Sequence, residues 1–217
     1  MQFETYAKQL YTGVLSDVMD SLGQTSQAMR PFIRPVDDAS VLMGRARTGL
    51  YATVYGRRDN DNPYELEMEL VDSLTKDDVA VLACNGPTER IAPWGELLST
   101  AAKMRGANGC VTDGLVRDTK HIKHLGFPVF HGGIGPLDSI GRAKMIEHDT
   151  EIICAGVIVR SGDIVFADID GVVVIPQDIE QQVLDLAMTK ATSENNSRNE
   201  LLEGRLLREV YEKYGVL

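Results

Sequence analysis

The chain has 217 residues, 43% of them hydrophobic, and a formal net charge of -10 at pH 7. Its length and hydrophobic content suffice for one domain with a substantial core over residues 1–217, whereas its acidity disfavours nucleic acid as a partner because like charges repel. No apolar run is long enough to span a membrane, and Met1–Leu10 lacks the apolar centre of a signal peptide, so we expect a soluble, cytoplasmic protein with no membrane partner.

Helical and extended patterns alternate in the first half of the chain. Apolar residues recur at helical spacing before Gly23 and again before Gly106, and a glycine is suited to end each of these helices. Segments rich in Thr, Val, Leu and Tyr favour strands. We expect helices at 5–22, 65–74 and 97–105, and strands at 41–55 and 79–84.

The second half continues this alternation and ends in helix. A strand at 109–111 is expected to lead into a turn at 113–118 and a short helix ending at Leu125, and the glycine-rich segment 131–136 is expected to be a loop. Strands mixed with helices throughout predict an α/β architecture. We expect further strands at 128–130, 151–159, 164–166 and 172–175, and a helical tail at 177–217 that is interrupted at 193–198 and at Gly204.

The three cysteines, Cys84, Cys110 and Cys154, are widely spaced and include no C-x-x-C pair. Each lies in an apolar, strand-like segment. We therefore expect buried, reduced thiols rather than disulfides or zinc ligands.

One group of residues could support metal chemistry. Twenty residues separate Glu96 from the adjacent pair Arg117 and Asp118, and a helix that returns through a strand would bring the pair back beside Glu96. Carboxylates bind hard cations such as Mg²⁺, and the planar guanidinium of arginine binds carboxylates. The group predicts a site where one divalent metal and one small anion meet.

The backbone near Gly95 could complete this site. Gly95 permits a tight turn just before a helix, so that the amides of Leu97 and Leu98 become free first-turn donors. Such amides, together with the helix dipole, bind carboxylates. The whole set suits a small 2-oxo acid chelated to a metal that polarises its keto group and stabilises the enolate formed on carbon–carbon cleavage.

Each residue also has a purely structural explanation. Asp118 could cap the helix that ends at Leu125, and its neighbour Arg117 could form an ordinary salt bridge with it. Glu96 is favoured in a first helical turn by the helix dipole alone. Taken singly, these explanations are the stronger ones, and the functional interpretation depends on the residues acting together.

The segments Trp94–Leu98 and Asp113–Asp118, at this spacing, resemble the acid-X20-Arg-Asp motif of the 4-hydroxy-4-methyl-2-oxoglutarate aldolase family, which shares its fold with RraA, the regulator of ribonuclease activity A. The resemblance runs from about residue 12 to the C-terminus. The other matching segments are Ser16–Gly23, Pro128–Phe130, Gly141–Arg142, Gly162–Asp168 and Gly171–Pro176.

The resemblance implies a layered α/β/β/α sandwich of the swivelling β/α type, with an N-terminal helix and a C-terminal helical extension at about 177–217. It also implies assembly into homotrimers or homohexamers. Residues Thr53–Asn62, which include Arg57, Arg58, Asp59 and Asp61, could shape substrate choice in such a fold, although a solvated charged loop is the plainer interpretation.

The resemblance also implies roles for individual residues. Asp118 would be the one direct protein ligand of Mg²⁺ or Mn²⁺, and Glu96 would act as a catalytic acid or base through a metal-bound water. Arg117 would bind the keto oxygen, and the amides of Leu97 and Leu98 would bind the pyruvyl carboxylate.

A glutamate donated by a neighbouring subunit is implied as well. Glu194 is the first candidate for that residue and Glu200 is the second. At the first motif position the family's aldolases more often have aspartate, and Glu96 is one methylene longer.

The expected activity is a metal-dependent lyase. It would cleave 4-hydroxy-4-methyl-2-oxoglutarate or 4-carboxy-4-hydroxy-2-oxoadipate to pyruvate by a retro-aldol reaction, with oxaloacetate decarboxylation as a side activity. The alternative is a non-catalytic regulator that, like RraA, binds a protein partner such as a ribonuclease.

Overall fold

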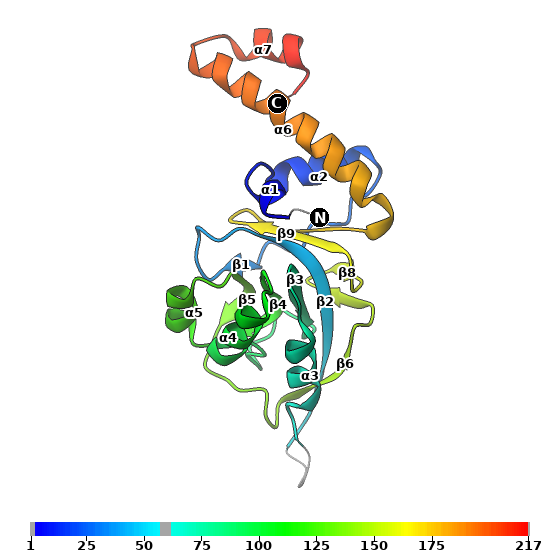
Figure 1. Cartoon of the computed structure of the whole chain (residues 1–217), viewed down its shortest axis with the longest axis vertical. Helices are drawn as coiled ribbons and strands as arrows, with labels where there is room; N and C mark the ends of the chain where they lie inside the picture. The colour runs from blue at the N-terminus through cyan, green and yellow to red at the C-terminus, as the bar shows by residue number, and fades with distance from the viewer. Residues whose placement is uncertain (1–2, 57–61, 217) are drawn as a thin grey trace.

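The computed structural model describes residues 3–56 and 62–216, and its centre is an eight-stranded sheet (Figure 1). The strands follow the order β1-β5-β4-β3-β2-β9-β10, and β6 also pairs with β2. Two further strands, β7 and β8, form a separate hairpin. The strands are β1 (Arg34–Pro35), β2 (Leu42–Thr53), β3 (Asp78–Ala83), β4 (Gly109–Val116), β5 (Val129–Ile134), β6 (Ala143–His148), β7 (Ile152–Cys154), β8 (Val157–Val159), β9 (Ile164–Asp168) and β10 (Gly171–Ile175).

The four middle strands, β2 to β5, are parallel to one another. Parallel neighbours need crossover connections, and here each crossover contains a helix: α3 (Glu65–Ser73), α4 (Glu96–Arg105) and α5 (Thr119–Leu125). Leu70, Ala102 and Ile122 bring all three helices into one buried cluster with the strands. Because β3 and β4 are parallel neighbours, their carboxyl ends lie at the same edge of the sheet, and the start of α4, which follows β3, lies beside the end of β4.

The other face of the parallel strands is also buried. Val79 and Val81 of β3 belong to a core cluster with the β7–β8 hairpin, whereas Ala80 and Leu82 face the helices. This alternation follows from the two-residue period of a strand. A strand buried on both faces reads as a nearly continuous apolar run, and β3 is apolar from Val79 to Ala83.

The chain has further helical segments, all of which except α7 contribute to a third buried cluster with β9 and β10. They are α1 (Phe3–Ala7), α2 (Thr12–Ser21), the 3₁₀ turn Gln177–Ile179, α6 (Glu180–Leu202) and α7 (Leu207–Tyr214). Asp168 fixes the start of α2, because its carboxylate accepts hydrogen bonds from Thr12 N at 2.9 Å and Thr12 Oγ1 at 2.7 Å. The outer part of α6 and all of α7 project away from the sheet (Figure 1).

The predicted α/β class, the N-terminal helix and the long C-terminal helix are confirmed. The single helix expected at 5–22 is instead two helices, α1 and α2, with a break at residues 8–11. The interruption expected at 193–198 is wrong, since α6 continues to Leu202. Asn195, Asn196 and Arg198 are exposed and only Ser197 is buried, so the helix accommodates this polar segment.

Two loops were also predicted wrongly. Residues 113–116 continue β4, and residues 131–134 belong to β5. The pairing of Leu115 with Gly133 holds both segments in the sheet, so tertiary pairing overrides the turn preference of glycine. Strand β6 was not predicted.

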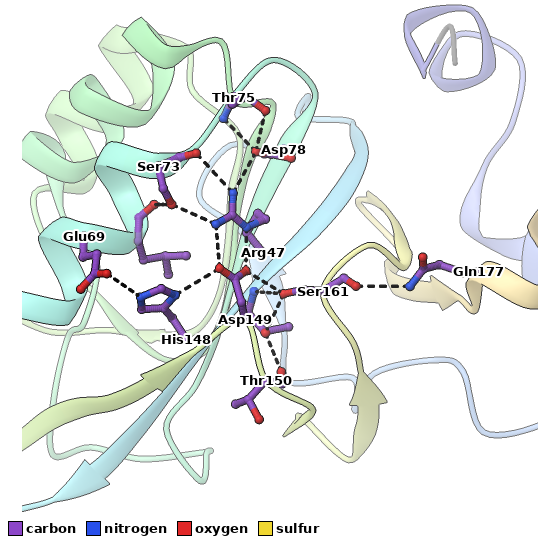
Figure 2. Close-up of polar contacts among 12 residues, drawn as sticks. Arg47, Glu69, Ser73, Thr75, Asp78, His148, Asp149, Thr150, Ser161 and Gln177 are labelled. Carbon is purple, nitrogen blue, oxygen red and sulfur yellow. Dashed lines mark hydrogen bonds and ion pairs between the residues drawn. The ribbon is translucent and has the colours of Figure 1, made fainter.

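Figure 2 shows a polar network around Arg47 of β2. Its guanidinium donates to both oxygens of Asp149, from Nε to Oδ1 at 2.6 Å and from Nη2 to Oδ2 at 2.7 Å. Nη2 also donates to Ser73 Oγ at 2.9 Å, at the end of α3, and Ser161 Oγ donates to Asp149 Oδ1 at 2.9 Å. The network therefore joins the central strand to α3 and to the segments that follow β6 and β8.

Asp149→Asn is expected to lower the free energy of unfolding at pH 7 by about 1 kcal/mol. The hydrogen bond from Arg47 lowers the pKa of Asp149 from 3.8 to about 2. On acidification the unfolded chain takes up this proton first, so the stabilisation is lost as the pH falls from about 4 to about 2.

Urea unfolding measures this effect. As the pH falls over this range, the free energy of unfolding should decrease less for Asp149→Asn than for the unaltered protein. Glu151→Gln is a suitable control, because the side chains of Glu151 and Arg160, which form an ion pair, are both about half-exposed. An unchanged pH dependence in Asp149→Asn would refute the assignment.

All three cysteines are free; Cys110 and Cys154 are buried and Cys84 is partly buried. Burial raises the pKa of each of these thiols. Within 3–56 and 62–216, no helix combines the length and apolarity needed to cross a bilayer. Arg57, Arg58, Asp59 and Asp61 lie outside the described residues.

Candidate active site at the end of β4

The start of α4 is fixed against the end of β4 by the backbone and by one buried tryptophan. Trp94 pairs with Val116 as an isolated parallel bridge, and Arg117 N donates to Trp94 O at 3.1 Å. The indole Nε1 of Trp94 donates to Ser99 Oγ at 2.8 Å, and Ser99 Oγ donates to Gly95 O at 2.9 Å. The residues after Trp94 and after Val116 are thus held side by side.

Asp118 has an unusual conformation for the residue that precedes a helix. It is the N-cap of α5 but has left-handed backbone angles, φ 59° and ψ 28°, and its side chain makes no capping hydrogen bond. The carboxylate turns toward α4 instead, where Glu96 N donates to Oδ2 at 3.4 Å. Arg117 Nε lies 3.7 Å from the same oxygen. Asp118 therefore occupies the N-cap position of α5, but the expectation that its carboxylate caps this helix is wrong.

Gly95 provides the space that this arrangement needs. A Cβ atom on Gly95 would lie 2.9 Å from Asp118 Oδ2 and 3.1 Å from Arg117 Cγ. The backbone of Gly95 is extended, with φ -154°, so the steric contact, and not the backbone conformation, requires glycine here.

Gly95→Ala is expected to leave the fold intact but to displace Asp118 and Arg117. The atoms that the new methyl group would meet belong to partly exposed side chains that can move, so the melting temperature should change little. A displacement of about 1 Å can lower turnover about a hundredfold. Gly13→Ala is the matched control, since a Cβ there would meet its nearest neighbour at an ordinary 3.6 Å. Normal turnover in Gly95→Ala would contradict the predicted site.

A second carboxylate holds Arg117 in place. Arg117 Nη1 donates to Asp138 Oδ2 at 2.7 Å. The other oxygen of Asp138 accepts hydrogen bonds from Tyr64 OH at 2.8 Å and from Ile140 N at 2.7 Å. Although partial burial opposes it, these hydrogen bonds and the positive charge of Arg117 lower the pKa of Asp138. The guanidinium is therefore oriented before any ligand binds.

These residues line one pocket of about 290 Å³. This volume is close to the lower end of the range for small-molecule sites. The structure brings the predicted Gly95, Glu96, Leu97, Leu98, Arg117 and Asp118 together in its wall, with Tyr64, Glu67, Met68, Ala92, Pro93, Trp94, Asp138 and Ser139.

The first turn of α4 is oriented as an anion site requires. The helical hydrogen-bond ladder begins with Ser99 N, which donates to Gly95 O at 3.1 Å, so the amides of Leu97 and Leu98 precede it. The side chain of Glu96 accepts a hydrogen bond from Thr100 Oγ1 at 2.9 Å, on its own helix.

Glu194 and Glu200 are not part of this pocket within one chain. Glu194 lies on α6 and accepts a hydrogen bond from Tyr11 OH. Glu200 accepts a hydrogen bond from Tyr214 OH at 2.8 Å and pairs with Lys213. Both belong to the helical layer over β9 and β10 or to the projecting tail.

Sequence reasoning missed Tyr64, Glu67 and Asp138. Glu67 could have been found, because it lies three and four residues before Leu70 and Val71 and so on the apolar face of its helix. Tyr64 and Asp138 precede and follow regular elements, and no local pattern marks such residues.

The carboxylates of the pocket suit a divalent metal that keeps much of its hydration shell. Among the described residues no three His, Cys, Asp or Glu side chains are grouped as a cage. Mg²⁺, however, commonly binds through one or two carboxylates and retains several waters. The carboxylate of Asp118 is 46% exposed, and the space that Gly95 leaves beside it is the space that a methyl group would fill. The residues present therefore fit a hydrated cation with one protein ligand.

Comparisons with known proteins identify the family of this chain. A profile of the RraA-like family, described as Aldolase/RraA, matches residues 12–174. A Halalkalibacterium halodurans protein named "Putative 4-hydroxy-4-methyl-2-oxoglutarate aldolase" is 30% identical over 190 residues, 88% of this chain and 84% of that protein. Protein DlpA of Legionella pneumophila is 28% identical over 200 residues, which are 92% of this chain and 32% of DlpA; this chain therefore spans less than half of DlpA.

A solved structure extends the comparison to the fold. The crystal structure of Streptomyces coelicolor RraAS2, described as an unusual member of the RNase ES inhibitor RraA protein family, has a TM-score of 0.78 at 24% identity. The match covers 89% of this chain and 96% of that chain. Because the family profile covers most of the chain, including Gly95 and the Arg117–Asp118 pair, the protein belongs to the Aldolase/RraA family.

Proposed function

We propose that this protein is a divalent-metal-dependent carbon–carbon lyase that releases pyruvate from a 4-hydroxy-2-oxo acid by a retro-aldol reaction. The substrates we favour are 4-hydroxy-4-methyl-2-oxoglutarate and 4-carboxy-4-hydroxy-2-oxoadipate, with oxaloacetate decarboxylation as a side activity. The observation that carries the proposal is the carboxylate of Asp118, which turns away from its own helix toward Arg117 and the Glu96 amide. The name of the Halalkalibacterium halodurans relative supports the same chemistry.

Each residue of the pocket would have a distinct role in binding or catalysis. Asp118 would hold Mg²⁺ or Mn²⁺, which when bound supplies a Lewis acid that polarises the keto group. Arg117 would bind the keto oxygen and stabilise the negative charge that develops there. The amides of Leu97 and Leu98 would bind the substrate carboxylate at the positive end of α4, and Glu96 would position a water molecule beside the cation.

A coupled pyruvate assay tests this proposal. The purified protein should release pyruvate from 4-hydroxy-4-methyl-2-oxoglutarate and from oxaloacetate when Mn²⁺ or Mg²⁺ is present, and EDTA should stop both reactions. Lack of turnover on both substrates with either metal would refute the proposed activity.

The second candidate is a non-catalytic regulator that binds a protein such as a ribonuclease. The likeness to RraAS2 in fold favours it. A regulator has no need of the Arg117–Asp118 arrangement, so Arg117→Ala should leave protein binding unchanged while it removes a catalytic activity. Stoichiometric partner binding without Mn²⁺ binding would favour the regulator.

We also propose that the protein assembles as a homotrimer or homohexamer, in which a neighbouring subunit supplies Glu194 or Glu200 to the pocket. The support is the position of both residues on α6, the helix that projects from the sheet (Figure 1). Light scattering after gel filtration measures the assembly. Mixing inactive Arg117→Ala subunits with inactive Glu194→Gln subunits should restore activity if Glu194 acts across the interface.

A further inference from the structure

Glu67 is a buried acid in the wall of the pocket. It lies on α3, is 8% exposed and belongs to the lining that also includes Arg117 and Asp118. One of its oxygens, Oε2, accepts a hydrogen bond from Tyr51 OH at 2.7 Å. The roles derived above for the pocket residues do not use it.

The surroundings of Glu67 favour a carboxyl group that exchanges its proton near neutral pH. Burial raises the pKa of Glu67 from 4.5 to about 7, against the opposing hydrogen bond from Tyr51. Asp138 raises the pKa further and Arg117 lowers it. The other ionisable groups near it are those of Tyr64 and Cys84.

The geometry distinguishes Glu67 from the other pocket acids. Asp138 is held by Arg117, and Glu96 is hydrogen-bonded to Thr100 on its own helix. Glu67 is hydrogen-bonded to Tyr51, which lies deeper in the core at 2% exposure. In a pocket of about 290 Å³, a small substrate held by Arg117 would also be close to Glu67.

We propose that Glu67 is the general base and general acid of the retro-aldol reaction. Its carboxylate takes the proton of the C4 hydroxyl, the C4 oxygen becomes a carbonyl, and the electron pair of the C3–C4 bond passes into the enolate of pyruvate. The protonated Glu67 then gives the same proton to C3, which yields pyruvate and restores the carboxylate. This inference rests on the proposed function.

The decisive variant is Glu67→Gln, which retains the shape of the side chain but cannot transfer the proton. With Mn²⁺ and 4-hydroxy-4-methyl-2-oxoglutarate, kcat should fall about a hundredfold or more while KM changes little. Single-turnover release of CO₂ from oxaloacetate should stay within about threefold, because that cleavage has no hydroxyl to deprotonate and precedes the protonation of C3. The matched control is Glu69→Gln, two residues along the same helix, whose side chain is 61% exposed; it should leave both rates unchanged.

A second measurement is independent of activity and of metal. The pKa of Glu67 is higher in the folded protein than in the unfolded chain. The contribution of Glu67 to the free energy of unfolding is therefore fully present below about pH 4.5 and is lost as the pH rises through about 7. Glu67→Gln should lack this fall in the free energy of unfolding, whereas Glu69→Gln should retain it.

The possible results separate this inference from the proposed function. If Glu67→Gln cleaves 4-hydroxy-4-methyl-2-oxoglutarate at the rate of the unaltered protein, or loses equal fractions of its rate on both substrates, the role of Glu67 is overturned and the lyase proposal stays intact. An unaltered pH dependence of stability in Glu67→Gln would also overturn it. Inactivity of the unaltered protein on both substrates would overturn the lyase proposal and this inference with it.

Discussion

Arg117→Ala is expected to lower kcat for pyruvate release by about 10²–10³-fold, because a preorganised donor to a developing oxyanion contributes that much. The change should cost little stability, since the side chain is 38% exposed. Steady-state kinetics with 4-hydroxy-4-methyl-2-oxoglutarate and Mn²⁺, together with a thermal melt, measure both effects.

Arg117→Lys separates charge from geometry. Lysine retains the positive charge but lacks the planar fork, so it should recover only part of the activity. Arg105→Ala is the matched control, because Arg105 forms an exposed ion pair with Asp72 on α3 and should affect neither rate nor KM. Near-normal turnover in Arg117→Ala would remove Arg117 from the mechanism.

Asp118→Asn is expected to abolish metal-dependent turnover because it weakens metal binding. If Asp118 is the protein ligand, the loss of its charge should raise the Kd for Mn²⁺ by more than about a hundredfold, since even loss of an outer-sphere partner costs 10–100-fold. Isothermal titration with Mn²⁺ measures this directly, without substrate.

The matched control for this variant is Asp72→Asn, which removes a charge from an exposed position on α3. Asp118→Asn should also fold normally, because the carboxylate makes no capping hydrogen bond to α5. Unchanged Mn²⁺ affinity in Asp118→Asn would show that the metal, if bound, has another ligand.

The part of the site that follows from the sequence is the part built by one strand–helix–strand unit. Glu96 begins α4 and Arg117 follows β4, and a parallel crossover returns the chain to the same edge of the sheet, so their proximity could be predicted from spacing. The boundaries of the strands could not be predicted from spacing. Segment 113–116 was expected to be a turn, and only its pairing with β5 shows that it is strand.

The rest of the pocket depends on contacts between segments far apart in the chain. Asp138 reaches Arg117 from a segment between β5 and β6, and Tyr64 reaches Asp138 across 74 residues. No local pattern encodes such a contact. Glu67 is a different case, since an acid on the apolar face of a helix violates the usual pattern and marks a position where function can outweigh stability.

The ion pair between Arg117 and Asp138 has a consequence for how ligands bind. A free arginine side chain loses rotamer entropy of up to about 2 kcal/mol when it is immobilised, but here folding has already imposed that loss. Small rigid dianions such as oxalate should therefore bind the metal-loaded protein with a modest entropic penalty. Asp138→Ala should make their association more favourable in enthalpy, less favourable in entropy and weaker in sum.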